Sequence, residues 1–559
     1  MGRIESYQFE LGDNIGAPDA VFDEVFLKSC FIDLPGAEKL YDTSNPFSII
    51  LARTGCGKTA LLERAKASFD NVVQVSPEAI SFNYISNSSS IKFFEKIGVS
   101  VEPFYKLLWQ HVIIIELIRQ RFNIKERGDL ESLRYRILNY FRSDAEKEAL
   151  EYFQEWAGDF WESAEYKPEE VVTKIDQQLK AGLGADFASL SAELSAADAH
   201  QKEWSGRIIQ KAHEAVMNNA QLAKLTRLLA VLNREVFNDP SQKFIVLIDD
   251  LDEGWVTDNN LRFKLIRALI ETVKTMRTLQ NVKVLVALRT DLRDTVFRET
   301  TSTGFQLEKY KSLFFELRWS RQDLEKLVER RIDAEFSAKY TKDAITSKDL
   351  FSVEKVDGGK KPVEYILERT LNRPREAIVF LNACIAKALG KSKIDRAIIR
   401  AAEREYSRER FQSLYEEWGL EHPLILEQAS ILRDLEVPFC LNDLTNDYLR
   451  NHLEDLATSQ DTDKLESDPI MRRFLHNYNS QTSNSKEASI IDACRRELVC
   501  MFYKVGLVGI KPYRSPREWS FIDSPTIQMH EIDTGSSIDI HIAFDLALRL
   551  QRKGSRKES

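Results

Sequence analysis

The sequence predicts an α/β fold: a core with a parallel sheet, a helical insertion, a helical lid and a C-terminal winged-helix-like domain. Three short apolar runs, at residues 47–51, 244–248 and 282–288, lead to this prediction. Continuous apolar runs of this length are typical of central parallel strands that are covered on both faces. Polar residues follow each run, and the carboxyl ends of parallel strands meet at the edge of the sheet where ligands bind.

The first run leads into residues 52–59, which match the P-loop pattern G-x-x-x-x-G-K-[ST] with Ala52 in place of the first Gly. Glycines let successive N–H groups approach phosphate oxygens at a helix N-terminus, where the dipole favours negative charge. The alternative is a chance glycine turn before a helix. The pattern predicts a P-loop NTPase core that binds the nucleotide through Arg53, Thr54, Gly55, Cys56, Gly57, Lys58 and Thr59.

The expected cofactors are ATP and Mg²⁺. Lys58 is expected to reach the β- and γ-phosphates, and the Thr59 hydroxyl to ligate the metal. The second run ends in residues 249–252, Asp-Asp-Leu-Asp, a Walker B pattern. Asp249 is predicted to hold Mg²⁺ opposite Thr59, and Asp250 to orient or deprotonate the attacking water. An acidic turn after a strand is the alternative interpretation.

Three arginines are further candidates for contact with phosphate. Arg289 ends the third run and is expected to sense the γ-phosphate; a salt bridge to Asp291 or Asp294 is the alternative. Arg373 and Arg375 flank a proline at a helix start, and a guanidinium fork suits phosphate. We predict a catalytic role for Arg289 and Arg375 and a nucleotide-binding role for Arg373. Ordinary helix-surface arginines are the alternative for the last pair.

The rest of the chain is expected to be largely helical. The apolar stretch 104–122 is too short to span a bilayer and is flanked by charge, so it predicts a buried helix. Three strand-like runs after residue 506 indicate a winged helix, a module that binds DNA or protein. The expected domains are 1–100 (first part of the core), 101–235 (insertion), 236–335 (second part of the core), 336–405 (lid) and 406–559 (winged-helix-like domain).

Composition limits the class of protein. The net charge of −9 argues against a protein that coats nucleic acid non-specifically, although one domain could still carry a basic face. The six cysteines are scattered without metal-ligand or disulfide spacing, which favours a reducing compartment. No apolar run of membrane-spanning length and no signal-peptide core are present in the sequence. We therefore expect a cytoplasmic location and no membrane partner.

The motifs at 52–59, 249–252, 289–291 and 372–375 occur in this order and resemble bacterial STAND- and AAA+-type P-loop ATPases with Orc/KAP-like character. The nearest likeness is a poorly characterised family found near anti-phage defence and mobile-element genes. The resemblance implies Mg·ATP binding, slow hydrolysis, and homo-oligomerisation or switching of an effector protein. Asp250 stands where many AAA+ enzymes carry Glu, which puts fast turnover in doubt. The sequence has no Asn-Lys-x-Asp guanine box, so ATP is expected over GTP.

We therefore expect a regulatory ATPase that switches partner binding or oligomerisation, with anti-phage defence as its setting. One alternative is a DNA-handling ATPase of the origin-recognition or transposition-helper type. The winged helix and a basic C-terminal tail favour it, and the net negative charge opposes it. The other alternative is a scaffold that binds ATP and barely hydrolyses it. Neither a Cys/His metal cluster nor a nucleophile elbow occurs in the sequence, so no separate effector chemistry is expected.

Overall fold

The computed structural model of this chain forms two compact units. Unit 1 comprises Met1–Ile32, Thr54–Gly57 and Arg318–Ser559, and unit 2 comprises Asp33–Arg53 and Lys58–Leu317. The structure describes residues 8–77, 100–123, 220–252, 259–300, 307–340, 344–478, 484–512, 515–520 and 527–553.

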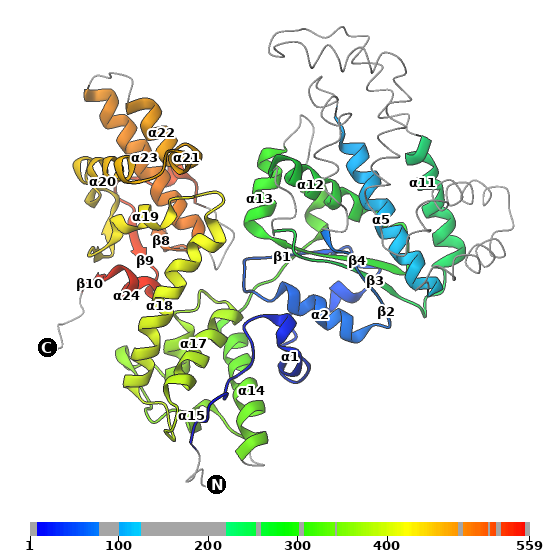
Figure 1. Ribbon diagram of the computed structural model, residues 1–559, viewed down its shortest axis with the longest axis horizontal. Helices are drawn as coiled ribbons and strands as arrows, with labels where there is room; N and C mark the ends of the chain where they lie inside the picture. The colour runs from blue at the N-terminus through cyan, green and yellow to red at the C-terminus, as the bar shows by residue number, and fades with distance from the viewer. Residues whose placement is uncertain are drawn as a thin grey trace, which may run out of the picture. The chain divides into compact units, whose positions relative to one another are not determined.

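Unit 2 contains a five-stranded parallel sheet with the order β2-β3-β4-β1-β5 (Figure 1). Its strands are β1 (Ile49–Ala52), β2 (Asn71–Gln74), β3 (Phe244–Ile248), β4 (Val282–Arg289) and β5 (Phe314–Glu316). The three predicted apolar runs form β1, β3 and β4, and their residues are buried up to the last residue of β4. The register pairs Ala52 with Arg289 and Ile248 with Val286, so these three strands end at one edge of the sheet.

Helices cover both faces of this sheet. They are α2 (Lys58–Ser68), α5 (Glu102–Phe122), α11 (Ala220–Val231), α12 (Asn259–Met276) and α13 (Thr290–Glu299), with a π-helical turn at Leu232–Val236 and 3-10 turns at Ala37–Tyr41 and Leu307–Leu313. In Figure 1, α5 and α12 lie on one side of the sheet and α2 on the other. The Trp109 indole of α5 donates to the Leu265 carbonyl of α12 at 2.9 Å.

The buried helix predicted at 104–122 is confirmed as α5, which contributes thirteen buried residues to this unit. We predicted an insertion at 101–235. Its two described ends, α5 and α11, share one hydrophobic core with the sheet. They therefore belong to the core of unit 2, and the stretch of the predicted insertion from 124 to 219 lies outside the described residues.

The first part of unit 1 is a helical bundle. Its helices are α1 (Glu24–Cys30), α14 (Arg321–Tyr340), α15 (Ser347–Leu350), α16 (Pro362–Leu367), α17 (Pro374–Lys387) and α18 (Arg396–Trp418), with 3-10 turns at Ala20–Phe22 and Asp357–Gly359. The Phe380 ring of α17 stacks on the Tyr406 ring of α18, with centroids 4.6 Å apart. Helix α17 begins at Pro374. Proline is favourable at the first position of a helix, because the N–H that it lacks would have no hydrogen-bond partner within the helix.

The C-terminal part of unit 1 has its own hydrophobic core. Its helices are α19 (Ile425–Ala429), α20 (Asn446–Ser459), α21 (Thr462–Ser467), α22 (Pro469–Tyr478), α23 (Asn484–Val505) and α24 (Asp545–Leu548), with 3-10 turns at Ser430–Leu432, Leu441–Asp443, Met529–Glu531 and Ile542–Phe544. Strands β7 (Phe439–Cys440), β9 (Ser537–Ile540) and β8 (Val508–Lys511) form an antiparallel sheet in that order, and β6 (Glu436–Val437) pairs with β10 (Gln551–Arg552). One of the strand-like runs after residue 506 covers residues 517–521, and in its described part, up to residue 520, one bridge forms, between Glu518 and Ile510.

No helix in the described part of the chain is both long enough and apolar enough to cross a bilayer.

Candidate functional site

In unit 2, two of the predicted site residues meet at the edge where β1, β3 and β4 end. Thr59 lies in the first turn of α2, directly after the loop that follows β1, and Asp249 directly follows β3. The Thr59 hydroxyl donates a hydrogen bond to Asp249 Oδ2 at 2.8 Å, across 190 residues of sequence. The Asp250 backbone N–H donates to the other carboxylate oxygen of Asp249 at 3.0 Å. Both bonds fix the orientation of this carboxylate.

The Asp249 carboxylate has hydrogen-bond donors but no salt-bridge partner among the described residues. Burial raises its pKa to about 6, although the hydrogen bonds from Thr59 and from the Asp250 N–H act in the opposite direction. Within the described residues, no arginine, lysine or histidine forms an ion pair with it. At neutral pH the group is therefore mostly ionised at a cost in free energy, and a bound cation would lower that cost.

The geometry of these two side chains fits Mg²⁺. Ligands of magnesium lie about 2.0–2.1 Å from the metal in an octahedron, so adjacent ligand oxygens are about 3 Å apart. The Thr59 and Asp249 oxygens, 2.8 Å apart, match that spacing. In the described part of the chain, no group of three His, Cys, Asp or Glu side chains could hold a metal by itself. A metal held by Thr59 and Asp249 would therefore need further oxygen ligands from water or from a bound molecule.

The loop at 52–59 has the backbone that its glycines allow. Gly55 and Gly57 have φ values of 75° and 93°, in the left-handed region that side chains disfavour. Lys58, the first residue of α2, donates from Nζ to the Arg53 carbonyl at 3.3 Å. The Thr54 hydroxyl is buried and makes no hydrogen bond to a described residue.

The four central residues of this loop group with unit 1, where helix α17 contacts them. The Arg375 backbone N–H donates to the Gly55 carbonyl at 3.2 Å. A Cβ added at Gly55 would lie 3.1 Å from Arg375 Cβ. Both this close contact and the positive φ therefore favour glycine at position 55. The Trp319 indole donates to the Cys56 carbonyl at 2.8 Å. Sequence reasoning missed Trp319, because no motif marks a side chain that supports a loop from 263 residues away.

Arg289 forms salt bridges, the arrangement given above as the alternative to sensing the γ-phosphate. Its Nη2 lies 2.7 Å from Asp291 Oδ2 and its Nε donates to Asp291 Oδ1 at 3.2 Å. Its Nη1 lies 3.4 Å from a carboxylate oxygen of Asp252. These contacts hold the guanidinium at the end of β4, beside the strand that leads into the 52–59 loop. The candidate Asp294 pairs with Arg293 instead.

Arg373 and Arg375 differ sharply, although only one residue separates them. The Arg375 Nε donates to the Pro18 carbonyl at 3.1 Å, and its terminal nitrogens make no bond to a described residue. The Arg373 side chain is only 2% exposed and lies 2.7 Å from Glu417. Burial works against its charged form, but the Glu417 carboxylate outweighs that effect and the pKa of Arg373 is raised. Arg373 is therefore part of the interior of unit 1.

Arg373 belongs to a buried group that we call the arginine–glutamate cluster: Arg373, Glu376, Tyr406, Arg410 and Glu417. Glu417 accepts from Arg410 at 2.5 Å, and Arg410 also binds Glu376. The Tyr406 hydroxyl lies 2.9 Å from the other Glu376 oxygen. Each charge in this cluster has a partner of the opposite sign.

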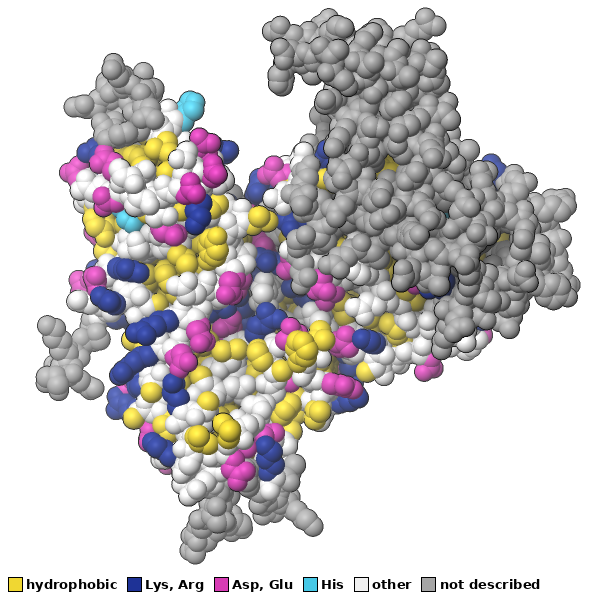
Figure 2. Space-filling model, viewed as in Figure 1, with side chains coloured by type: hydrophobic (Ala, Val, Ile, Leu, Met, Phe, Trp, Pro, Cys, Tyr) yellow, Lys and Arg dark blue, Asp and Glu magenta, His cyan; other side chains and the backbone are white. Residues whose placement is uncertain are grey.

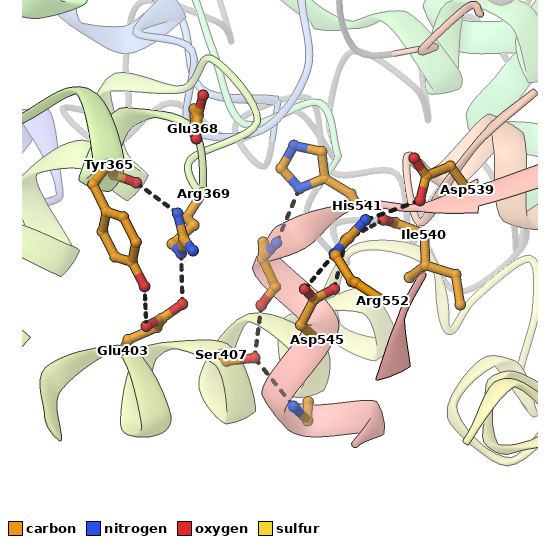
Figure 3. Close-up of polar contacts among 12 residues, drawn as sticks. Tyr365, Glu368, Arg369, Glu403, Ser407, Asp539, Ile540, His541, Asp545 and Arg552 are labelled. Carbon is orange, nitrogen blue, oxygen red and sulfur yellow. Dashed lines mark hydrogen bonds and ion pairs between the residues drawn. The ribbon is translucent and has the colours of Figure 1, made fainter. Parts of the chain in front are cut away.

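A second set of polar contacts joins α18 to its neighbours (Figure 3). Glu403 accepts from the Tyr365 hydroxyl at 2.7 Å and from Arg369 Nε at 2.5 Å. The Ser407 hydroxyl donates to the Ala543 carbonyl at 2.6 Å. Helix α18 thus contacts both the bundle and the C-terminal part of unit 1.

His541 is packed in the interior of unit 1. Its Nδ1 accepts from the Ala543 N–H at 3.3 Å, and its ring meets Trp519 edge-on at 5.3 Å. Burial lowers its pKa to about 3, so the ring is neutral at physiological pH.

Residues 322–415 match the model of a family described as the FunZ-associated C-terminal helical domain. The match covers α14 to α17 and most of α18, and so includes Arg373 and Arg375 but none of the strand-end residues of unit 2. No curated protein sequence matches this chain.

Proposed function

We propose that this chain is a Mg·ATP-dependent regulatory ATPase with a P-loop core of the STAND/AAA+ type. The observation that carries the proposal is the 2.8 Å bond between Thr59 and Asp249. A hydroxyl directly after a G-x-G-K loop and a carboxylate at a strand end form the pair that a P-loop site requires for its metal. In this proposal Mg²⁺ neutralises charge that develops on the phosphates, and Thr59 and Asp249 hold it.

The remaining strand-end residues have distinct roles in the proposal. Asp250 follows Asp249, is exposed and has a backbone φ of 60°, a conformation that is costly for a non-glycine residue. Its carboxylate orients or deprotonates the attacking water. The backbone N–H groups of the 52–59 loop and Lys58 hold the phosphates. Arg289, and Arg375 through its free terminal nitrogens, stabilise negative charge.

We further propose that nucleotide state controls partner binding. The candidate partners are a second copy of this chain or an effector protein, the setting is a cytoplasmic anti-phage defence, and the C-terminal part is a winged-helix-like module. Support for that module comes from the order β7-β9-β8, in which the two later strands pair as a hairpin after α23. Helix α18 offers a route for coupling, because it contacts both the bundle and this C-terminal part.

The test compares Lys58→Ala with a matched control, Lys66→Ala, an exposed lysine on the same helix. Loss of Lys58 is expected to weaken Mg·ATP binding by about a hundredfold, since a charged phosphate contact is worth about 1.5–3 kcal/mol. The control is expected to bind as the wild type does. Fluorescent-nucleotide titration and phosphate release measure the two steps. Normal binding and hydrolysis by Lys58→Ala would reject the proposal.

A nucleotide-locked scaffold is the second candidate. Arg289 favours it, because two carboxylates already engage this guanidinium and an engaged arginine is less available to a transition state. Asp250→Asn separates the two candidates. A regulatory ATPase loses turnover in this variant and keeps nucleotide binding, whereas a scaffold has no turnover to lose. Sizing the protein with and without Mg·ATP tests the change of assembly that both candidates imply.

A further inference from the structure

Helix α18 carries a row of arginines at four-residue intervals: Arg396, Arg400, Arg404 and Arg408. Side chains four apart lie on one face of a helix, with about 6 Å of rise between them, so the row is about 18 Å long. Tyr415 lies on the same face as Arg404 and Arg408, seven residues beyond the last of them. We call these five residues the arginine face.

The arginine face is exposed and only partly neutralised. Arg396 and Arg400 both pair with the Asp357 carboxylate, and Arg400 also pairs with Glu403 at 3.2 Å. Arg404 and Arg408 are exposed, and neither side chain forms a hydrogen bond or ion pair with a residue that the structure describes. The Tyr415 ring is 44% exposed, a large value for an aromatic side chain. Cationic forks and an aromatic ring are thus available to a ligand on one helix face.

Positive charge continues next to α18. Helix α24 packs on α18 through the bond from the Ala547 N–H to the Ser407 hydroxyl at 3.2 Å. Arg549 follows α24, is exposed, and has no bonding partner in the described residues. In Figure 2, dark-blue Lys and Arg side chains gather along the left edge of the view, over α18 and the adjoining α24–β10 segment. This concentration contrasts with the net charge of −9 of the whole chain.

The helix that a winged-helix protein would place in a DNA groove is not available here. In the sheet order of this module that helix is α23, which directly precedes the β8–β9 hairpin. Lys504 is the only exposed residue of α23 from position 491 onward. Arg495 and Arg496 on this helix are tied to Asp492. A nucleic-acid surface of unit 1 would therefore lie elsewhere, and the arginine face is a place where exposed cations without a described partner stand in a row.

We propose that the arginine face binds single-stranded nucleic acid, with the arginines on the phosphates and Tyr415 stacked on a base. The fork of arginine matches phosphate oxygens, and a linear row suits a linear polyanion better than a single small anion. Base-on-aromatic stacking is the usual second contact in single-strand binding. A flat anionic membrane fits less well, because Glu405 and Glu409 lie only about 100° further round the helix and would face it too. The proposal does not depend on the nucleotide site.

The test measures binding of a labelled oligonucleotide of about 20 residues by fluorescence anisotropy, in DNA and RNA versions and as single strand and duplex, from about 50 to 200 mM salt. Wild type is expected to bind the single strand best and to lose affinity steeply with salt. Arg404→Glu/Arg408→Glu should weaken binding at least about tenfold. Removing these two contacts should flatten the salt slope by about 1.4 for a single strand. Tyr415→Ala should cost about tenfold on the single strand and little on the duplex.

The matched control is Lys464→Glu/Arg472→Glu, which makes the same change in charge at two exposed cations on α21 and α22. It should bind within about twofold of wild type, because the proposal is local and does not rest on net charge. Arg404→Gln/Arg408→Gln removes the charges without adding acids and should show a smaller loss in the same direction. Lys58→Ala should bind the oligonucleotide normally, so failure here and failure of the ATPase proposal are distinguishable.

Four outcomes would overturn the proposal. They are no binding by the wild type at low salt, an unchanged affinity in the Arg404/Arg408 variants, an equal loss in the control, and tighter binding of the duplex than of the single strand. Retention on anionic phospholipid vesicles without oligonucleotide binding would likewise reject it in favour of a membrane surface.

Discussion

The strand-end residues of unit 2 and the arginine–glutamate cluster of unit 1 both gather charge, but they neutralise it differently. In unit 2, the half-buried Asp249 carboxylate is held by a hydroxyl and an N–H and forms no ion pair with a described residue. In unit 1, Glu417 binds both Arg373 and Arg410. Asp249 thus has no ion-pair partner among the described residues, whereas each charge of the arginine–glutamate cluster has a partner of opposite sign.

This difference distinguishes a candidate ligand site from a cluster of charges that stabilises the fold. A carboxylate with a raised pKa at an open strand end costs stability, and such a cost is typical of sites that bind a ligand. A buried ion network with matched charges needs no ligand, although removing one member exposes the full cost of the others. The sequence suggested phosphate contact for Arg373 and metal contact for Asp249. In the structure, Arg373 is buried against Glu417, and Asp249 forms no ion pair with a described residue.

The largest change in stability is expected when one charge of the arginine–glutamate cluster is removed. Glu417→Ala leaves Arg373 buried without its carboxylate and should destabilise unit 1 by about 3–5 kcal/mol. Glu416→Ala, at an exposed neighbour on the same helix, should cost less than about 0.5 kcal/mol. Denaturant unfolding measures both free energies. A loss below about 1 kcal/mol for Glu417→Ala would show that solvent reaches the cluster.

The next effect depends on pH. The folded pKa of His541, about 3, is below its unfolded value of about 6.5, so the unfolded chain binds the extra proton as pH falls through 6.5. Its contribution to stability is present at pH 7 and falls by about 2 kcal/mol by pH 5. His541→Asn keeps an acceptor for the Ala543 N–H and does not titrate. This variant should lose about 2 kcal/mol less than wild type between pH 7 and 5 in denaturant unfolding. Equal losses in the two proteins would contradict the burial of a neutral ring.

A smaller effect of opposite sign is expected at Asp249. Its folded pKa is raised to about 6, so its contribution to stability is present below about pH 4 and is lost as pH rises through 6. Asp249→Asn should therefore stabilise the metal-free protein by about 1–2 kcal/mol at pH 8 and by little at pH 4. Mg·ATP should raise the melting temperature of the wild type and not of the variant. A variant that is less stable at pH 8 would place Asp249 among the structural carboxylates.

The smallest effect concerns the loop. Gly55→Ala places a Cβ at a φ of 75° and 3.1 Å from Arg375 Cβ. We expect a loss of about 1 kcal/mol in stability together with weaker Mg·ATP binding. Gly390→Ala is a useful control, because its φ is 77° and nothing lies within 4 Å of the added Cβ. Equal losses in both variants would mean that backbone strain alone matters at Gly55.

Much of the architecture was readable from local pattern. The apolar runs became β1, β3 and β4, and the stretch 104–122 became the buried helix α5, because continuous apolar sequence has few solutions other than full burial. The helices α21 and α22 were not predicted individually, although Ile470, Met471 and Phe474 of α22 lie at helical spacing and are buried. The sequence did not indicate that α5 and α11 share a hydrophobic core with the sheet, because a pattern does not say which sheet a helix packs against.

The candidate site also has some features that local sequence determined and others that only tertiary contacts decided. Local sequence determined the left-handed glycines of the 52–59 loop, the start of α2 at Lys58 and the acidic end of β3, since each depends on backbone preferences of neighbouring residues. Tertiary structure alone decided that Thr59 meets Asp249, that Asp291 holds Arg289, that Trp319 supports Cys56 and that Arg373 is buried against Glu417. These contacts join residues through the register of strands and the packing of helices. The side chains at two such positions do not specify in advance which of many charged partners they will meet.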